Sequence, residues 1–108
     1  MTVKAINVHD LKQMLENEED FLLVDCREQG EWDEGHIPTA EFMPLSTFAE
    51  SSKPLDLHKN KLIVMQCRSG KRSLNACMQL LDRGFTNLAN LEGGILDWAE
   101  CGYKIVKD

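Results

Sequence analysis

Residues 61–83 read KLIVMQCRSGKRSLNACMQLLDR and carry the clearest structural signal in the chain. The apolar run Leu62–Met65 is short and rich in branched side chains, which favours a buried strand over the start of a helix. From Ser73 onward, apolar residues recur every three or four positions, as on one face of an amphipathic helix that Gly84 is placed to end. That predicted face consists of Leu74, Cys77, Met78 and Leu81. The stretch therefore predicts a strand, a tight loop and a helix, with Cys67 at the carboxyl end of the strand.

The loop between this strand and helix, CRSGKR at 67–72, combines a thiol with three cationic side chains. A loop that leads into a helix turns several backbone N–H groups toward one point, and the helix dipole adds partial positive charge there. We expect the Cys67 thiol to be open to water and to ionise more readily than a free thiol, with room beside it for a second anion. Gly70 can take the positive φ angle that lets the chain curl around the sulfur. The alternative, a cysteine that only fills space in the core, would have no use for neighbouring cations.

Three segments of the chain resemble the signatures of the single-domain rhodaneses, sulfurtransferases in which a loop cysteine carries a sulfane sulfur as a persulfide. The loop at 67–72 matches their six-residue active loop, which begins with the nucleophile. Residues 34–40, EGHIPTA, resemble their amino-terminal signature, with Thr39 in place of the usual glycine. Residues 91–98, LEGGILDW, resemble their carboxyl-terminal signature, with Ile95 where an aromatic residue is common. The resemblance covers nearly the whole chain, and neither departure touches the loop.

The resemblance implies an enzyme, a thiosulfate sulfurtransferase, in which the Cys67 thiolate takes the outer sulfur of a small anionic donor. A thiophilic acceptor such as cyanide, a small thiol or a cysteine of another protein would then remove that sulfur. We expect Arg72 and Lys71 to bind the oxyanion of the donor, and the loop N–H groups to hold the persulfide charge, while Arg68 points outward. The predicted donor-binding residues are Arg68, Ser69, Gly70, Lys71, Arg72 and Ser73. This chemistry requires no metal ion and no organic cofactor.

The rest of the chain alternates strand-like and helix-like segments. Further strands are predicted at 3–8, 21–26, 40–45 and 87–91. Helices are predicted to begin at Asp10, with Gln13 completing a capping box, and at Ser46, and residues 51–54 are expected to form a loop. The alternation predicts an α/β fold with three layers, α/β/α, around a mainly parallel sheet of about five strands, the rhodanese-like fold. A chain of this length is expected to form one domain, residues 1–108.

The strand predicted at 21–26 ends in Asp25, Cys26 and Arg27. Carboxyl ends of parallel strands meet at the ligand-facing edge of a sheet, so Asp25 should lie near Cys67. Asp25 and Arg27 resemble the rhodanese strand end at which acid and base pairs brace the active loop. We assign both a supporting role, in which Asp25 accepts hydrogen bonds from the loop or from an arginine, and capping of the next helix stays an open alternative. Cys26 is a candidate redox partner of Cys67, although the alternation directs its side chain to the core.

Composition and charge exclude several classes of function. A formal net charge of −6 argues against general nucleic-acid binding, which requires a basic face. No apolar run approaches the ~20 residues of a membrane span. The first residues lack the apolar segment of a secretory signal, so we expect a cytoplasmic protein. The four cysteines lack the spacing of a zinc site and should be reduced thiols in that compartment, and Cys77 and Cys101 are interpreted as small apolar residues of helices.

Two other functions compete with sulfur transfer. Cysteine phosphatases also place a cysteine and an arginine in a loop at a helix start, but they resemble His-Cys-x5-Arg. Here Gln66 precedes Cys67, and Arg72 follows after four intervening residues, which favours a smaller ring around a single sulfur. Noncatalytic rhodanese-like modules bind partners and typically lack the cysteine that this chain retains.

Overall fold

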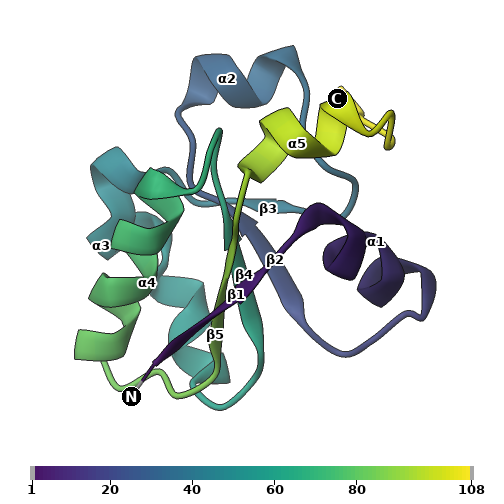
Figure 1. Ribbon diagram of the computed structural model, residues 1–108. Coiled ribbons are helices and arrows are strands. Elements are labelled where there is room, and N and C mark those ends of the chain that lie inside the picture. The colour runs from purple at the N-terminus through teal and green to yellow at the C-terminus, as the bar shows by residue number, and fades with distance from the viewer. Residues whose placement is uncertain (1, 108) are drawn as a thin grey trace.

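The computed structural model describes residues 2–107, in which helices cover both faces of a five-stranded sheet (Figure 1). The strands are β1 (Val3–Ile6), β2 (Leu22–Asp25), β3 (Glu41–Phe42), β4 (Ile63–Gln66) and β5 (Leu88–Leu91). The helices are α1 (Val8–Glu16), α2 (Gln29–Glu34), α3 (Phe48–Ser51), α4 (Lys71–Asp82) and α5 (Gly94–Glu100). Two 3₁₀ helices span Leu45–Thr47 and Lys53–His58. No helix within residues 2–107 is long and apolar enough to cross a membrane.

The strand order is β1-β5-β4-β2-β3, and all four pairings between these strands are parallel. β4 lies at the centre, and its residues Ile63, Val64 and Met65 are fully buried because helices cover both faces of the sheet. This arrangement confirms the predicted α/β fold with a parallel sheet of five strands. The parallel direction also brings the carboxyl ends of the strands to one edge, where α2 and the loop after β4 lie (Figure 1).

Two apolar clusters form the core, one on each face of the sheet. Alternate residues of β4 divide between them: Met65 and Cys67 belong to the cluster under α3 and α4, and Val64 to the cluster under α1 and α5. Residues of β2 divide in the same way, and Cys26 joins the α3 and α4 side. Because side chains alternate along a strand, Cys26 and Cys67 therefore face the same layer of helices.

Several predicted element boundaries are wrong. The strand predicted at 3–8 ends at Ile6, and the one predicted at 40–45 spans only Glu41–Phe42. The N-cap of α1 is Asn7, whose Oδ1 accepts from the Asp10 N–H at 2.8 Å, while the Asp10 carboxylate accepts from the Asn7 N–H at 3.1 Å. Asp10 is thus the third residue of the capping box and not its first. Ser46 does not cap a helix, because its hydroxyl donates to the Glu28 carboxylate at 2.5 Å. Residues 51–54 join α3 to a 3₁₀ helix and form no open loop.

The apolar face predicted for α4 is also partly wrong. Cys77 is buried as expected, but Leu74 and Met78 are 45% and 53% exposed. The face that packs on the sheet consists of Ser73, Ala76, Cys77 and Leu80. Three of these four residues are small, which lets the helix approach the strands closely, so side-chain size as well as hydrophobicity selects the buried face. The apolar interpretation of Cys101 is wrong too, since Cys101 is exposed at the end of α5.

Candidate active site

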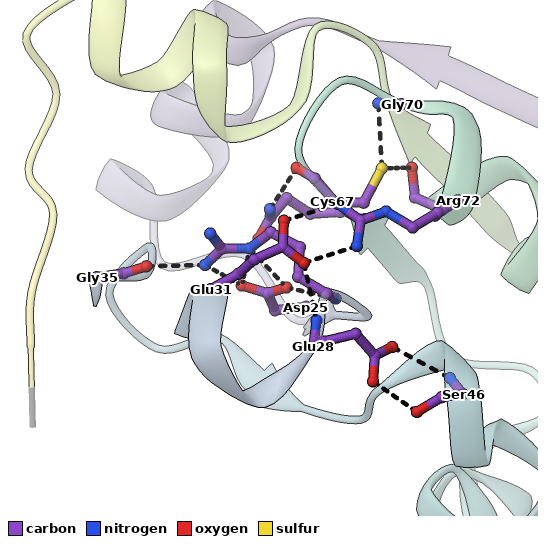
Figure 2. Close-up of polar contacts among 11 residues, drawn as sticks. Asp25, Glu28, Glu31, Gly35, Ser46, Cys67, Gly70 and Arg72 are labelled. Atoms are coloured by element: carbon purple, nitrogen blue, oxygen red, sulfur yellow. Dashed lines mark hydrogen bonds and ion pairs between the residues drawn. The ribbon is translucent and has the colours of Figure 1, made fainter. Parts of the chain in front are cut away.

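Cys67 follows the last residue of β4 and begins the loop that leads into α4. Gly70 caps this helix with a φ angle of 110°, in the left-handed region that glycine adopts at little cost, as predicted. The helix starts at Lys71, two residues earlier than the sequence pattern indicates. The turn at Gly70 brings the helix amino terminus back over the sulfur (Figure 2).

The Cys67 sulfur lies within a ring of hydrogen-bond donors. The Gly70 N–H donates to Sγ at 3.1 Å (Figure 2), and the Ser73 hydroxyl oxygen lies 3.3 Å from Sγ. The Ser73 hydroxyl donates its hydrogen to Asn90 Oδ1, and Asn90 Nδ2 donates to the Gly70 carbonyl at 3.1 Å. Asn90, at the end of β5, thus ties both ends of the loop turn in place. In the sequence, the signal that would have pointed to Asn90 is a polar residue within the otherwise apolar strand 88–91.

Cys26 completes this ring from the neighbouring strand. Its side chain is fully buried in the same apolar cluster as Cys67, and its interaction with the Cys67 sulfur is the largest influence on the pKa of both thiols. The prediction that Cys26 points to the core is confirmed, and the structure adds that it contacts Cys67 as well.

These donors stabilise the thiolate form of Cys67. The hydrogen bond from Cys26 is the largest cause that lowers the pKa of Cys67 to about 4, and the Ser73 hydroxyl and the N–H groups of Ser73 and Gly70 add to it. Burial opposes this shift, because removal from water penalises the anion. The proton stays on the other sulfur, because the hydrogen bond to Cys67 and burial hold the pKa of Cys26 far above its ordinary value. At neutral pH the two cysteines together therefore carry one negative charge, and it is located on Cys67.

The predicted openness of Cys67 to water is wrong in this conformation, since the residue is only 1% exposed. Arg68, Ser69 and Lys71, which follow it in the loop, are exposed. The buried sulfur is therefore reached by a reagent only when the groups around it move.

The three cations of the loop differ in their surroundings. Arg72 makes a bidentate ion pair with Glu31 of α2, with Nη1 and Nη2 at 2.7 and 2.8 Å from the two carboxylate oxygens (Figure 2). This pair lowers the pKa of Glu31 to about 2 and raises that of Arg72. Arg72 is thus already engaged by a carboxylate, contrary to the expectation that it stands ready for a donor oxyanion. Arg68 and Lys71 are exposed, as expected for Arg68.

Asp25 and Arg27 support the site from behind. The Arg27 guanidinium donates to both Asp25 oxygens at 2.8 to 3.0 Å and to the Gly35 carbonyl at 2.8 Å. The side chains of Arg27 and Asp25 are 6% and 0% exposed. Asp25 thus accepts from an arginine as predicted, and Glu28, not Asp25, is the N-cap residue of α2. The positive charge of Arg27 also helps to keep the pKa of Glu31 low. The pair therefore reaches the loop indirectly, through Glu31 and Arg72.

The first turn of α5 forms the opposite wall of the loop. Ile95 and Leu96 donate their N–H groups to the carbonyls of Cys67 and Arg68 at 3.0 and 3.2 Å. A Cβ atom on Gly94 would lie 2.4 to 2.5 Å from backbone atoms of these same two residues. Gly94 is therefore required for this close backbone approach, whereas a Cβ atom on Gly93 would meet the Asp97 side chain; the glycine pair lies beside Cys67, as predicted.

Comparison with known proteins agrees with this geometry. Residues 7–101 match the family model described as Rhodanese-like domain. A protein of Allochromatium vinosum named sulfurtransferase is 38% identical over 104 residues, which cover 96% of this chain and 95% of that protein. A putative sulfurtransferase of Bacillus subtilis, YtwF, is 40% identical over 98 residues, or 91% of this chain and 92% of that protein.

A solved structure shares the fold as well. The crystal structure of a rhodanese-related protein from Thermoplasma volcanium superposes with a TM-score of 0.81 at 32% identity, covering 97% of this chain and 99% of that one. The relatives support a sulfurtransferase or rhodanese-like role. By its sequence motifs, its fold and the family match over residues 7–101, the chain belongs to the rhodanese-like domain family.

Proposed function

We propose that the protein is a thiosulfate sulfurtransferase in which Cys67 carries the sulfane sulfur as a persulfide. The observation that carries this proposal is the ring of donors from Cys26, Gly70 and Ser73 around the Cys67 sulfur, which favours a sulfur anion at that position. A thiolate that exists at neutral pH is the form that attacks sulfur. The free thiols at all four cysteines suit a reducing compartment, and we place the protein in the cytoplasm.

The transfer proceeds in two steps. In the first, the Cys67 thiolate attacks the outer sulfur of thiosulfate, a new S–S bond forms, and sulfite leaves with the electron pair of the old one. In the second, an acceptor such as cyanide attacks the outer sulfur, and the electron pair of the S–S bond returns to Cys67. The N–H groups of Gly70 and Ser73 stabilise the anion at both stages.

Loading requires the loop to shift, since Cys67 is enclosed. The exposed side chains of Arg68 and Lys71 attract the donor dianion to the loop. The Arg72 guanidinium adds positive charge, although its Nη1 and Nη2 groups already donate to the Glu31 carboxylate. Any direct contact of Arg72 with a donor oxyanion has to displace Glu31.

Intact mass spectrometry tests the proposal. A short exposure of the reduced protein to thiosulfate is expected to add one sulfur atom, and cyanide should remove it as thiocyanate. Cys67→Ala should gain no sulfur, whereas Cys77→Ala, which changes another buried cysteine, should gain it normally. A protein that takes up no sulfur at Cys67 and hydrolyses an aryl phosphate would be a phosphatase. One that does neither would be a binding module.

Glu31→Gln is expected to lower KM for thiosulfate by about threefold to tenfold with little change in kcat, because it releases Arg72 and removes a negative charge near the donor. Steady-state thiocyanate production over a range of thiosulfate concentrations measures both constants. Asp33→Asn removes the same charge from an exposed position on the same helix and serves as the control. A higher KM in Glu31→Gln would instead mean that Glu31 positions Arg72 for the donor.

A further inference from the structure

The two strands next to the active loop place Cys26 directly opposite Cys67. The parallel register of β2 and β4 runs from Leu22 opposite Ile63 to Asp25 opposite Gln66. At the start of the pairing, the Leu22 N–H donates to the Leu62 carbonyl at 3.0 Å. A second backbone hydrogen bond of the same kind lies four residues further along both strands. The Cys26 N–H donates to the Gln66 carbonyl at 2.9 Å in the same relation, so the register extends by one step to the two cysteines.

Both side chains also point to the same side of the sheet. Cys26 and Cys67 belong to one apolar cluster, on the side of the sheet that α3 and α4 cover. Neighbouring strands lie about 4.8 Å apart, which falls within the ~4.4–6.8 Å range of Cα separations that a disulfide can bridge. The backbone therefore already has the spacing that a Cys26–Cys67 disulfide requires.

We propose that Cys26 is a resolving thiol, which attacks the inner sulfur of a Cys67 persulfide, closes a Cys26–Cys67 disulfide and releases hydrosulfide. This inference rests on the proposed persulfide function. One S–S bond forms between the cysteines while the bond between Cys67 Sγ and the outer sulfur breaks. The outer sulfur leaves with that electron pair and the Cys26 proton, so it is reduced to hydrosulfide and the two cysteines are oxidised. The step needs no external oxidant.

When Cys67 carries a sulfane sulfur, the Sγ atom next to Cys26 changes from an anion to a neutral atom. In the unloaded protein, Cys26 donates its proton to the anionic Cys67 sulfur, which opposes its ionisation. In the persulfide, the charge lies on the outer sulfur, and Cys67 Sγ becomes a neutral atom that a nucleophile can attack. The contact between Cys26 and Cys67 thus stabilises a negative charge in the unloaded protein and brings a nucleophile to the inner sulfur in the persulfide. Cys26 touches the inner sulfur, whereas the donors of Gly70 and Ser73 surround the loop side.

The other two cysteines do not have this geometry. Cys77 lies on α4, and its sulfur faces the Ala89 carbonyl at 3.7 Å. Cys101 is exposed beyond α5. The chemistry of Cys26 would make the protein a source of sulfide from thiosulfate, with a dithiol reductant needed to reopen the disulfide for each new cycle.

Prolonged incubation with thiosulfate in the absence of acceptor tests this inference. The added sulfur of the wild-type protein is expected to be an early species that gives way to a mass two hydrogen atoms below the reduced protein, with about one sulfide released per chain. The four cysteines fall in four different tryptic peptides, so a disulfide that joins peptides 13–27 and 62–68 identifies the pair.

Cys26→Ser is the decisive variant, because serine keeps a hydrogen-bond donor toward Cys67 but cannot form a disulfide. It should retain the added sulfur and release sulfide at least about tenfold more slowly than wild type. Cys26→Ala should also retain the sulfur, and Cys77→Ala, from the same apolar cluster, should behave as wild type. Circular dichroism establishes that each variant is folded.

The outcomes separate the two proposals. If the wild-type protein keeps its added sulfur as long as Cys26→Ser does and no cross-linked peptide forms, the resolving role is overturned and the sulfurtransferase function stands. If no variant that retains Cys67 ever gains sulfur, the proposed function itself fails, and the resolving role fails with it.

Discussion

Alkylation of Cys67 by iodoacetamide is expected to proceed at a constant rate between about pH 6 and pH 9 and to slow only toward about pH 4. The reactive form is the thiolate, and the hydrogen bonds from Cys26, Ser73 and Gly70 lower the pKa of Cys67 to about 4. Lowering the pH through that value protonates the sulfur, so the rate falls on the acid side. A free thiol of pKa about 8.5 is less than about 1% ionised at pH 6 and would accelerate across the whole range.

Burial of the Cys67 sulfur lowers the rate of alkylation but does not change the pH at which that rate is half of its maximum. Because Cys67 is 1% exposed, each alkylation has to wait for the loop to shift, which scales the rate at every pH alike. The ultraviolet absorbance of the thiolate gives the same midpoint without any reagent. Mass spectrometry of peptide 62–68 separates Cys67 from the exposed Cys101, and circular dichroism restricts the data to pH values at which the protein is folded.

Cys26→Ala should move that midpoint upward, since the hydrogen bond from Cys26 is the largest cause of the low pKa. Cys26→Ser should move it less, because a hydroxyl still donates. An alkylation profile of the wild-type protein that rises through about pH 8.5 would show that the loop does not stabilise the anion, and the case for a persulfide carrier would lose its physical basis.

The sequence alone sufficed for the elements whose residues lie close together in the chain. The strand, the loop and the helix around Cys67 follow from a change of hydrophobic period and one glycine, and all three are present in the structure. The hydrophobic period did not correctly predict which face of α4 is buried. Leucine and methionine rank as more apolar than serine and alanine, yet Ser73 and Ala76 face the sheet because the helix backbone lies close to it.

Contacts between distant segments were beyond local pattern. Glu31 lies 41 residues from Arg72, and nothing around it marks it as the partner of a loop cation. The shared edge of a parallel sheet predicted that Asp25 and Cys26 lie near Cys67, but the register that sets Cys26 directly opposite Cys67 does not follow from alternation. Strand order and register, not composition, therefore decide which charged and nucleophilic groups meet at the edge of the sheet.

Asp25→Ala is expected to destabilise the folded protein by about 3–5 kcal/mol, because it leaves the Arg27 guanidinium buried without its carboxylate. Such a loss is a large share of the ~5–15 kcal/mol that holds a typical domain together. Urea unfolding followed by circular dichroism measures it as a fall in the midpoint at unchanged slope. Glu50→Ala, which breaks the exposed pair with Lys53, should cost less than about 1 kcal/mol and provides the control.

The loss of stability in Asp25→Ala comes from leaving the Arg27 charge buried without a partner rather than from a large stabilisation by the ion pair itself. Removing both partners in Asp25→Val with Arg27→Met should therefore recover part of the stability that Asp25→Ala loses, although the bond from Arg27 to the Gly35 carbonyl is not restored. Asp25 is the last residue of β2 and directly precedes Cys26, so the single variant should disturb the Cys26–Cys67 contact and raise the pKa of Cys67. A single variant as stable as the wild type would mean that water reaches Arg27, and the pair would then have no part in holding β2 against the loop.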